Sequence, residues 1–275
     1  MTRVALVQLA SPDEETQEER ILRAERTMLE HPGVDFFVLP ELWSAGYFSF
    51  DRYEQLAEPL DGPTVQMCRR VARELGAHVH VGSVIERDAE GRLHNTAVLV
   101  DDRGRIAQVY RKIHVFGYQS LESRLLTPGT TLGVVDSPLG ALGSTTCYDL
   151  RFPGLWQQLS VRGAETVIVP AAWPAARREH WRVLTQARAI EHQVWIVAVN
   201  SCGPQRGVEL GGYSRVVDPS GRVIAECGAE EQVLVVDVDA ERVAEVRAEF
   251  PVIADRLQDY AGISAENGAE PGVRP

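Results

Sequence analysis

The segment Gly143-Ser-Thr-Thr-Cys-Tyr-Asp-Leu-Arg-Phe-Pro153 is where an apolar run of the chain changes abruptly into a polar turn. This change is typical of a strand that ends in a turn and leads into a helix. Strands that alternate with helices build α/β folds. The segment also contains Cys147, and a thiol at a strand-to-helix junction can act as a nucleophile.

Short β-branched runs alternate with helical patterns on both sides of this segment. We predict about a dozen strands and about five helices. A hairpin turn at Asp101-Asp-Arg-Gly104 brings antiparallel pairing into the sheet. The strand-like runs are 4–9, 36–39, 78–85, 96–100, 106–110, 132–135, 166–169, 194–199, 213–217 and 233–238, and the helical runs are 18–30, 65–75, 152–162, 177–192 and 239–248.

So many strands exceed what one open sheet holds comfortably, and the helices suffice only for outer faces. We therefore expect two mixed β-sheets between outer helix layers, an α-β-β-α sandwich. The chain has 275 residues, and no linker rich in Pro, Gly or Ser interrupts it before about residue 260. A single domain over 1–260 is the prediction, followed by a disordered tail over 261–275 that has little to bury.

The charge balance restricts the partners. With 28 basic and 39 acidic residues, the formal net charge is 28 − 39 = −11. The sequence has no lysine-rich run or basic stripe, which argues against nucleic acid and anionic membranes as partners. The apolar run at 4–9 is too short for a spanning helix or a signal peptide, so we expect a cytoplasmic protein.

The four cysteines show neither CxxC nor Cys/His zinc spacing, so we expect no disulfide and no metal. The glycines lack dinucleotide-binding and P-loop spacing, so no cofactor is implied. Free cysteines are mostly buried hydrophobes, and this is our interpretation of Cys68, Cys202 and Cys227. Cys68 shares one helical face with other apolar residues of the run 65–75.

Cys147 differs because of three charged residues that also follow strand-like runs. Glu41 ends the run in Phe36-Phe-Val-Leu-Pro-Glu41, and Lys112 follows the run 106–110. Glu122 is the only glutamate between Lys112 and Cys147. Taken singly, each has an ordinary explanation: a solvated acid at a strand end, a lysine that extends to water, and a loop acid. We expect the Cys147 thiolate to be favoured by the following helix and by a nearby cation.

Taken together, these motifs resemble the nitrilase superfamily of carbon-nitrogen hydrolases. They are Leu39-Pro-Glu-Leu, Tyr110-Arg-Lys-Ile-His-Val-Phe116, Glu122 before Thr127-Pro-Gly129, and Thr146-Cys-Tyr-Asp-Leu-Arg-Phe-Pro153. The order Glu, Lys, Glu, Cys matches that family, and the resemblance extends from about residue 4 to 256. It implies that Glu41, Lys112, Glu122 and Cys147 are catalytic.

Amide hydrolysis needs an activated nucleophile, a stabilised oxyanion and a proton for the leaving nitrogen. Glu41 would take the Cys147 thiol proton, or share it in an ion pair, and would later protonate the departing amine and then activate water. Lys112 would hold the oxyanion, joined, as the resemblance implies, by the backbone N–H of Tyr148. Glu122 would orient Lys112 and keep it protonated. A Cys/His dyad with His114, His180 or His192 is the competing arrangement, but its local signature is missing.

The run after the cysteine resembles the Nit branch, which contains ω-amidases, rather than true nitrilases. The resemblance implies that Arg151 grips a substrate carboxylate, although a structural ion pair is the alternative. Trp173 and Tyr47 would line the pocket. Arg177 stands where ω-amidases usually have a small hydroxyl residue, so it either favours a more acidic substrate or faces solvent.

The resemblance further implies a small-molecule amide substrate and at least a homodimer through outer helices. Three other functions stay open at this point. The same four residues could act on an N-carbamoyl amide or on a nitrile, or the chain could be a non-catalytic binding protein on this fold.

Overall fold

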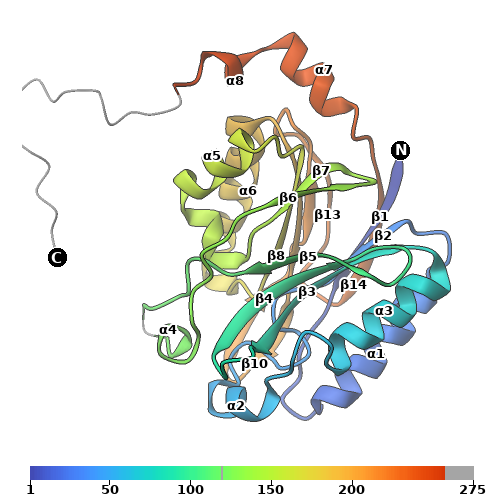
Figure 1. The fold of residues 1–275 in the computed structure, drawn as a ribbon, viewed down its shortest axis with the longest axis vertical. Coiled ribbons are helices and arrows are strands. Elements are labelled where there is room, and N and C mark those ends of the chain that lie inside the picture. Colours follow the sequence, from blue (N-terminus) through green and yellow to red (C-terminus); the bar gives the residue numbers. More distant parts are fainter. Residues whose placement is uncertain (119, 258–275) are drawn as a thin grey trace, which may run out of the picture.

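The computed structural model describes residues 1–118 and 120–257. Two six-stranded sheets pack face to face in it (Figure 1). The first sheet has the order β14-β1-β2-β3-β4-β5, and the second has the order β13-β12-β9-β8-β7-β6. The first sheet contains β1 (Thr2–Gln8), β2 (Phe36–Val38), β3 (His78–Arg87), β4 (Leu93–Val100), β5 (Ile106–Arg111) and β14 (Gln232–Val238).

The second sheet repeats the pairing pattern of the first. Three central parallel strands, β1-β2-β3 in one and β7-β8-β9 in the other, carry one antiparallel strand on one side and two on the other. A separate hairpin pairs β10 with β11. These strands are β6 (Val134–Ser137), β7 (Gly140–Ser144), β8 (Thr166–Ala171), β9 (Trp195–Asn200), β10 (Cys202–Gln205), β11 (Val208–Gly211), β12 (Arg215–Val217) and β13 (Val223–Glu226).

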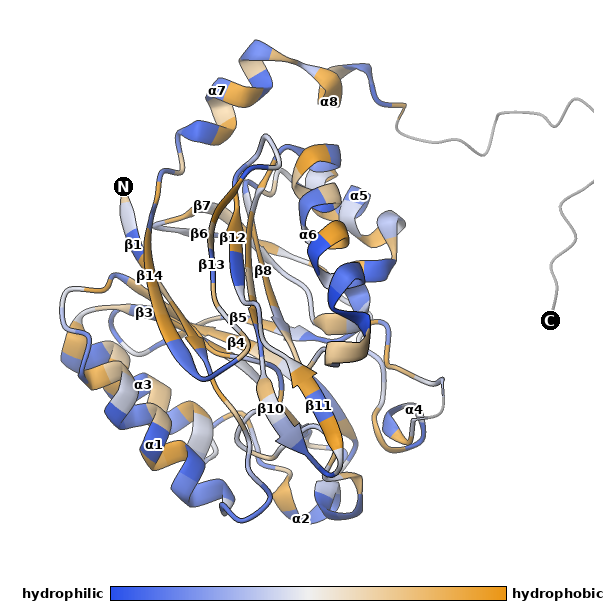
Figure 2. Cartoon of the chain, turned by 180° about the vertical axis from the view of Figure 1, so that it is seen from behind, coloured by the Kyte–Doolittle hydropathy of each residue, from blue (hydrophilic) through white to orange (hydrophobic). Residues whose placement is uncertain are grey.

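Helices cover the outer face of each sheet. α1 (Gln17–Leu29) and α3 (Pro63–Leu75) lie on the first sheet, and α5 (Pro153–Val161) and α6 (Arg178–His192) lie on the second (Figures 1 and 2). The side chain of Thr16 accepts the Glu19 N–H at the start of α1, and the Glu19 carboxylate accepts the Thr16 N–H, a reciprocal cap. Shorter helices are α2 (Tyr53–Leu56), α4 (Glu122–Leu125), α7 (Arg242–Glu249) and α8 (Val252–Asp255), with 3₁₀ turns at Phe50–Arg52, Cys147–Arg151 and Ala175–Arg177.

β2 and β9 are buried on both faces, as are residues 4–7 of β1, and this explains their largely apolar sequences. In β1, Val4 and Leu6 pack between the sheets against residues of β9 such as Val197, whereas Ala5 and Val7 belong to the layer under α1 and α3. Burying a side chain of this size stabilises the fold by roughly 1.5–3 kcal/mol. The sandwich is therefore held by three apolar layers: one between the sheets and one under each helix pair.

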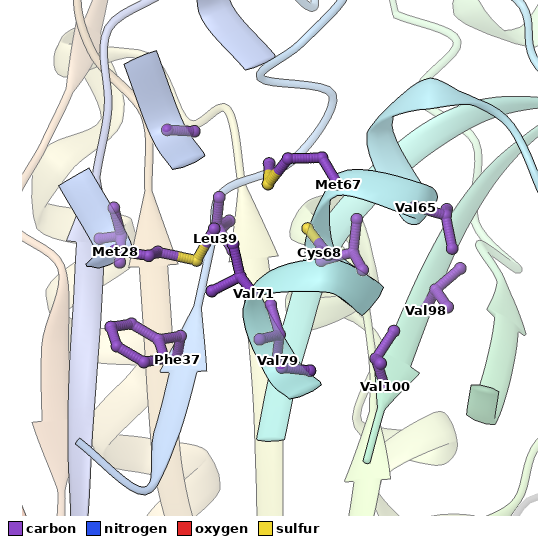
Figure 3. Close-up of a cluster of buried hydrophobic side chains, with 14 of the residues drawn as sticks. Met28, Phe37, Leu39, Val65, Met67, Cys68, Val71, Val79, Val98 and Val100 are labelled. Carbon is purple, nitrogen blue, oxygen red and sulfur yellow. The ribbon is translucent and has the colours of Figure 1, made fainter. Parts of the chain in front are cut away.

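The layer under α1 and α3 confirms the interpretation of Cys68. Its thiol is fully buried among Val71, Val79 and Leu39, with Met28 of α1 nearby (Figure 3). Burial raises the pKa of this thiol well above its ordinary range. Cys202 and Cys227 are buried as well, so all three match the prediction of buried hydrophobes.

The predicted α-β-β-α sandwich is confirmed, and the predicted long helices agree with α1, α3, α5, α6 and α7 to within a few residues. The hairpin β10-β11 and strand β13 were not predicted. The sequence of β10 is Cys-Gly-Pro-Gln. Gly and Pro are unfavourable in strands, so the sequence pattern did not predict this strand, which is formed by its pairing with β11. The predicted tail over 261–275 lies outside the described residues. No helix among residues 1–118 and 120–257 is long and apolar enough to cross a membrane.

Candidate active site

Glu41 follows β2 at the edge where the parallel strands of the first sheet end, and it is fully buried. The turn that carries it lies against a bulge in β3, where Gly82 has a φ of +73°. A Cβ at Gly82 would collide with the carbonyl oxygens of Pro40 and Leu39. The missing side chain therefore lets the Glu41 turn approach β3 closely.

Lys112 directly follows β5, is fully buried and lies between two carboxylates. Its Nζ is 2.8 Å from Oε1 of Glu41 and 2.8 Å from Oε1 of Glu122. Burial alone would lower the pKa of Lys112, but the charges of Glu122 and Glu41 outweigh it and raise that pKa well above its ordinary value. Lys112 is therefore a fixed cation.

Glu122 was predicted as a loop acid, and this placement is wrong. It begins the short helix α4 and is fully buried. Besides Lys112, its carboxylate accepts hydrogen bonds from the Tyr47 hydroxyl at 2.9 Å and the Phe116 N–H at 2.9 Å. A one-turn helix gives no periodic signal in a sequence, and this explains why the pattern did not predict it.

Cys147 follows β7 and opens a 3₁₀ turn with a φ of +47°. A non-glycine residue in this left-handed region costs on the order of 1–2 kcal/mol, so the surrounding contacts must hold it there. The Asp149 carboxylate provides such contacts, since it accepts the Thr146 N–H at 3.0 Å. The same carboxylate accepts the Tyr110 hydroxyl at 2.7 Å and the His114 N–H at 2.9 Å.

The expectation that the resting Cys147 is a favoured thiolate is wrong. Burial, and next the negative charge of Glu41, raise the pKa of this thiol well above its ordinary value, and the opposing effect of Lys112 is smaller. Lys112 is already neutralised by two carboxylates. The resting nucleophile is thus a protonated thiol beside the Glu41 carboxylate.

A cavity of about 660 Å³ opens onto Cys147. All five predicted substrate-binding residues line it: Tyr47, Tyr148, Arg151, Trp173 and Arg177. The walls are largely aromatic, with Phe48, Phe116 and Tyr118 among them. Pockets of this size with a few polar groups are typical of small-molecule sites.

Arg151 is held in place on the cavity wall. Its guanidinium carbon is 4.5 Å from the ring centroid of Trp173, a cation–π contact. Its Nη2 is 3.1 Å from Nδ1 of His180, so that ring nitrogen accepts the hydrogen bond. The alternative of an Arg151 ion pair is not found among the described residues.

Two residues of the site were not singled out from the sequence. Asn95 on β4 donates from Nδ2 to Glu41 at 2.8 Å and to Glu122 at 3.3 Å. Asp149 connects the turn of Cys147 to β5, the strand that Lys112 follows. A buried polar residue in an apolar strand was the available signal for Asn95. No group of three His, Cys, Asp or Glu side chains in the described part of the chain could hold a metal ion.

A four-layer sandwich with Glu, Lys, Glu and Cys at one edge defines cysteine hydrolases of the nitrilase type. The family model for carbon-nitrogen hydrolases matches residues 3–248, so the chain belongs to this family.

Individual relatives agree with this assignment. The chain is 37% identical over 263 residues to the 2-oxoglutaramate amidase of Paenarthrobacter nicotinovorans, with 93% of this chain and 90% of that protein covered. It is 32% identical to the omega-amidase NIT2 of Xenopus tropicalis, with coverage of 95% and 97%. Its fold resembles that of Saccharomyces cerevisiae Nit3, a member of branch 10 of the nitrilase superfamily. The TM-score to Nit3 is 0.80 at 30% identity, and 91% of this chain and 94% of that one are covered.

Proposed function

We propose that the chain hydrolyses a small, carboxylate-bearing amide through a thioester on Cys147 and releases ammonia. The observation that carries this proposal is that Cys147 lines the cavity and has the ion pair of Glu41 and Lys112 beside its thiol. The amidase names of the relatives support it.

In the first half of the reaction, Glu41 takes the thiol proton while the sulfur attacks the amide carbonyl carbon. A C–S bond forms and the carbonyl oxygen becomes an oxyanion. Lys112 and the backbone N–H of Tyr148 stabilise this charge. The intermediate then collapses, the C–N bond breaks, and the proton on Glu41 moves to the leaving nitrogen, so that ammonia departs.

In the second half, a water molecule attacks the thioester and gives a proton to Glu41. The C–S bond breaks, the acid product leaves, and the proton returns from Glu41 to the sulfur. Glu122 reacts with nothing in this scheme. It holds Lys112 in position, together with the Tyr47 and Phe116 contacts that fix its own carboxylate.

Arg151 is our choice for the residue that binds the substrate carboxylate. Its guanidinium lines the same cavity as Cys147, and a planar guanidinium suits bidentate recognition of a carboxylate. Trp173 and Tyr47 would enclose the carbon chain between the carboxylate and the amide.

The test is ammonia release from a panel of succinamate, α-ketoglutaramate, short aliphatic amides, N-carbamoyl amino acids and nitriles. We expect turnover of the carboxylate-bearing amides and a loss of at least about 10³-fold in Cys147→Ala. Cys68→Ala, which changes a thiol in the layer under α3, is the matched control and retains activity. Turnover confined to carbamoyl compounds or nitriles, or activity that survives in Cys147→Ala, would overturn the proposal.

We further propose that the protein forms a homodimer through the outer face of α5 and α6. Val161, Val183 and Ile190 on these helices are 53%, 61% and 53% exposed, and apolar side chains gathered on one face are typical of an interface. Light scattering after size exclusion should give twice the chain mass. Val183→Glu with Ile190→Glu should halve it, and a monomeric wild type would contradict the proposal.

A further inference from the structure

The cavity carries two guanidinium groups and no carboxylate. Arg151 and Arg177 both line it, and none of its described lining residues is Asp or Glu. The negative charge of the site belongs instead to Glu41 and Glu122, which are fully buried, are not among the lining residues and flank the cation of Lys112. The described lining of the cavity therefore carries a surplus of positive charge, which comes from Arg151 and Arg177.

The backbone of Arg177 is anchored, whereas its guanidinium has no bonding partner in the part of the chain described. Its N–H donates to the Pro174 carbonyl at 3.0 Å, and its own carbonyl accepts the Trp173 Nε1–H at 2.8 Å. The nearby Arg182 shows the contrast, because it is paired with Glu226. Arg177 is thus a half-buried cation at a fixed point of the cavity wall.

The two guanidinium groups also act on each other. Burial, and next the charge of Arg177, lower the pKa of Arg151. His180 does not relieve this repulsion, because its Nδ1 accepts from Arg151 and adds no negative charge. One substrate carboxylate at Arg151 would neutralise only one of the two cations, and a second anion would be favoured at Arg177.

We infer that the site takes amides that carry two carboxylates at the end opposite the amide, the first bound by Arg151 and the second by Arg177. The inference rests on the proposed function and names its substrate class. The cavity has room for such a molecule, since about 660 Å³ corresponds to roughly twenty water molecules at about 30 Å³ each. The aromatic walls would pack against the connecting carbons.

A matched set of ω-amides tests the inference. The reference compound is 4-carbamoylbutanoate, which has one carboxylate. 2-(2-Carbamoylethyl)malonate and 2-(2-carbamoylethyl)glutarate add a second carboxylate at a short and at a longer spacing. The second carboxylate would form a charge-assisted hydrogen bond with Arg177. We therefore expect kcat/KM to be roughly ten- to hundredfold higher for at least one dicarboxylate than for the reference compound. Equal or lower values for both dicarboxylates would overturn the inference.

Variants assign the effect to Arg177. Arg177→Gln should reduce the preference for the dicarboxylate over the reference by at least about fivefold. Arg178→Gln is the matched control, because this neighbouring guanidinium lies over the Tyr213 ring at 4.4 Å, and it should leave the preference unchanged. A preference that survives in Arg177→Gln, or that falls equally in Arg178→Gln, would contradict the assignment.

Binding separates this inference from the proposed reaction. Calorimetry on Cys147→Ala should give a dissociation constant at least about tenfold lower for the dicarboxylate than for 4-carbamoylbutanoate. That result stands even if no amide is turned over, in which case only the proposed function fails. Turnover of the reference without tighter dicarboxylate binding would leave the proposed function intact and refute the inference.

Discussion

Lys112 shows at the residue scale how the site depends on charges that balance one another. Three ionised groups with a net charge of −1 are fully buried, and they are stable because each has several partners. Glu41 accepts from Asn95 and from the Ala172 N–H at 2.8 Å each. Removing one member of such a group leaves a buried charge uncompensated, which typically costs about 3–5 kcal/mol.

Glu122→Gln tests this dependence. It retains the shape of the side chain but removes one charge, so Lys112 pairs with Glu41 alone and Glu41 becomes a weaker base. We expect kcat to fall by roughly ten- to hundredfold, with KM changed much less. Steady-state kinetics give both values. Glu86→Gln is the control. It breaks the ion pair between the buried Glu86 of β3 and the half-buried Arg111 of β5, so it should reduce stability while kcat is unchanged. An unchanged kcat in Glu122→Gln would contradict the role given to Glu122.

The protonated state of Cys147 has its own test. Because burial and Glu41 raise the pKa of this thiol, no Cys147 thiolate should form as the pH rises to about 9. Thiolates absorb near roughly 240 nm, so the absorbance at this wavelength can be followed against pH for the wild type and for Cys147→Ala. The difference in absorbance between the two proteins should not change with pH. A step near or below neutral pH would instead indicate a thiolate paired with Lys112.

At the scale of elements, Asp149 joins the turn after β7 to the exit of β5. Its carboxylate accepts from Thr146 and Tyr110, and from both the N–H and the Nδ1 of His114. Trp156 of α5 donates to its carbonyl at 3.1 Å. One side chain thus fixes the spacing between the nucleophile turn and the strand that carries Lys112.

Asp149→Asn should disturb this spacing. The carboxylate has two oxygens that accept these hydrogen bonds, whereas the amide has only one. Thr146 or His114 then loses its bond. We expect a loss of roughly 1–3 kcal/mol in the free energy of unfolding together with a lower kcat. Urea unfolding and kinetics on the same preparation measure both. Normal kcat in a destabilised variant would limit Asp149 to a structural role.

Much of this arrangement could be predicted from the sequence, for a physical reason. Strands buried on both faces, such as β1 and β9, read as unbroken apolar runs, and α1 and α3 show one apolar face each. The roles of Asn95 and Asp149 could not be predicted, because they depend on which strands and turns meet. β7 and β5 belong to different sheets, and no local pattern encodes their distance.

At the scale of the whole molecule, a chain of polar side chains connects the two sheets. His80 on β3 accepts the Gly82 N–H at Nδ1, 3.3 Å away, and donates from Nε2 to the Ser144 hydroxyl at 3.2 Å. Ser144 of β7 donates to Gln108 of β5 at 2.7 Å. Both ring nitrogens are in use with a single proton, so the ring is neutral, and burial lowers the pKa of His80 to about 3.

This histidine makes stability depend on pH. The pKa of His80 is about 6.5 in the unfolded chain and about 3 in the folded protein. Between these two pH values only the unfolded state binds the proton, so the free energy of unfolding decreases as the pH falls through this range. From pH 7 to 5 the contribution of His80 is about 2 kcal/mol. Urea unfolding at both pH values should show that His80→Gln loses about 2 kcal/mol less than the wild type over this interval. Equal losses would contradict this account.

The origin of the catalytic groups has a further consequence. Glu41 and Lys112 come from the first sheet and Cys147 from the second, so the nucleophile meets its base only after the two sheets have docked. Turnover therefore reports that both sheets are folded and packed against each other.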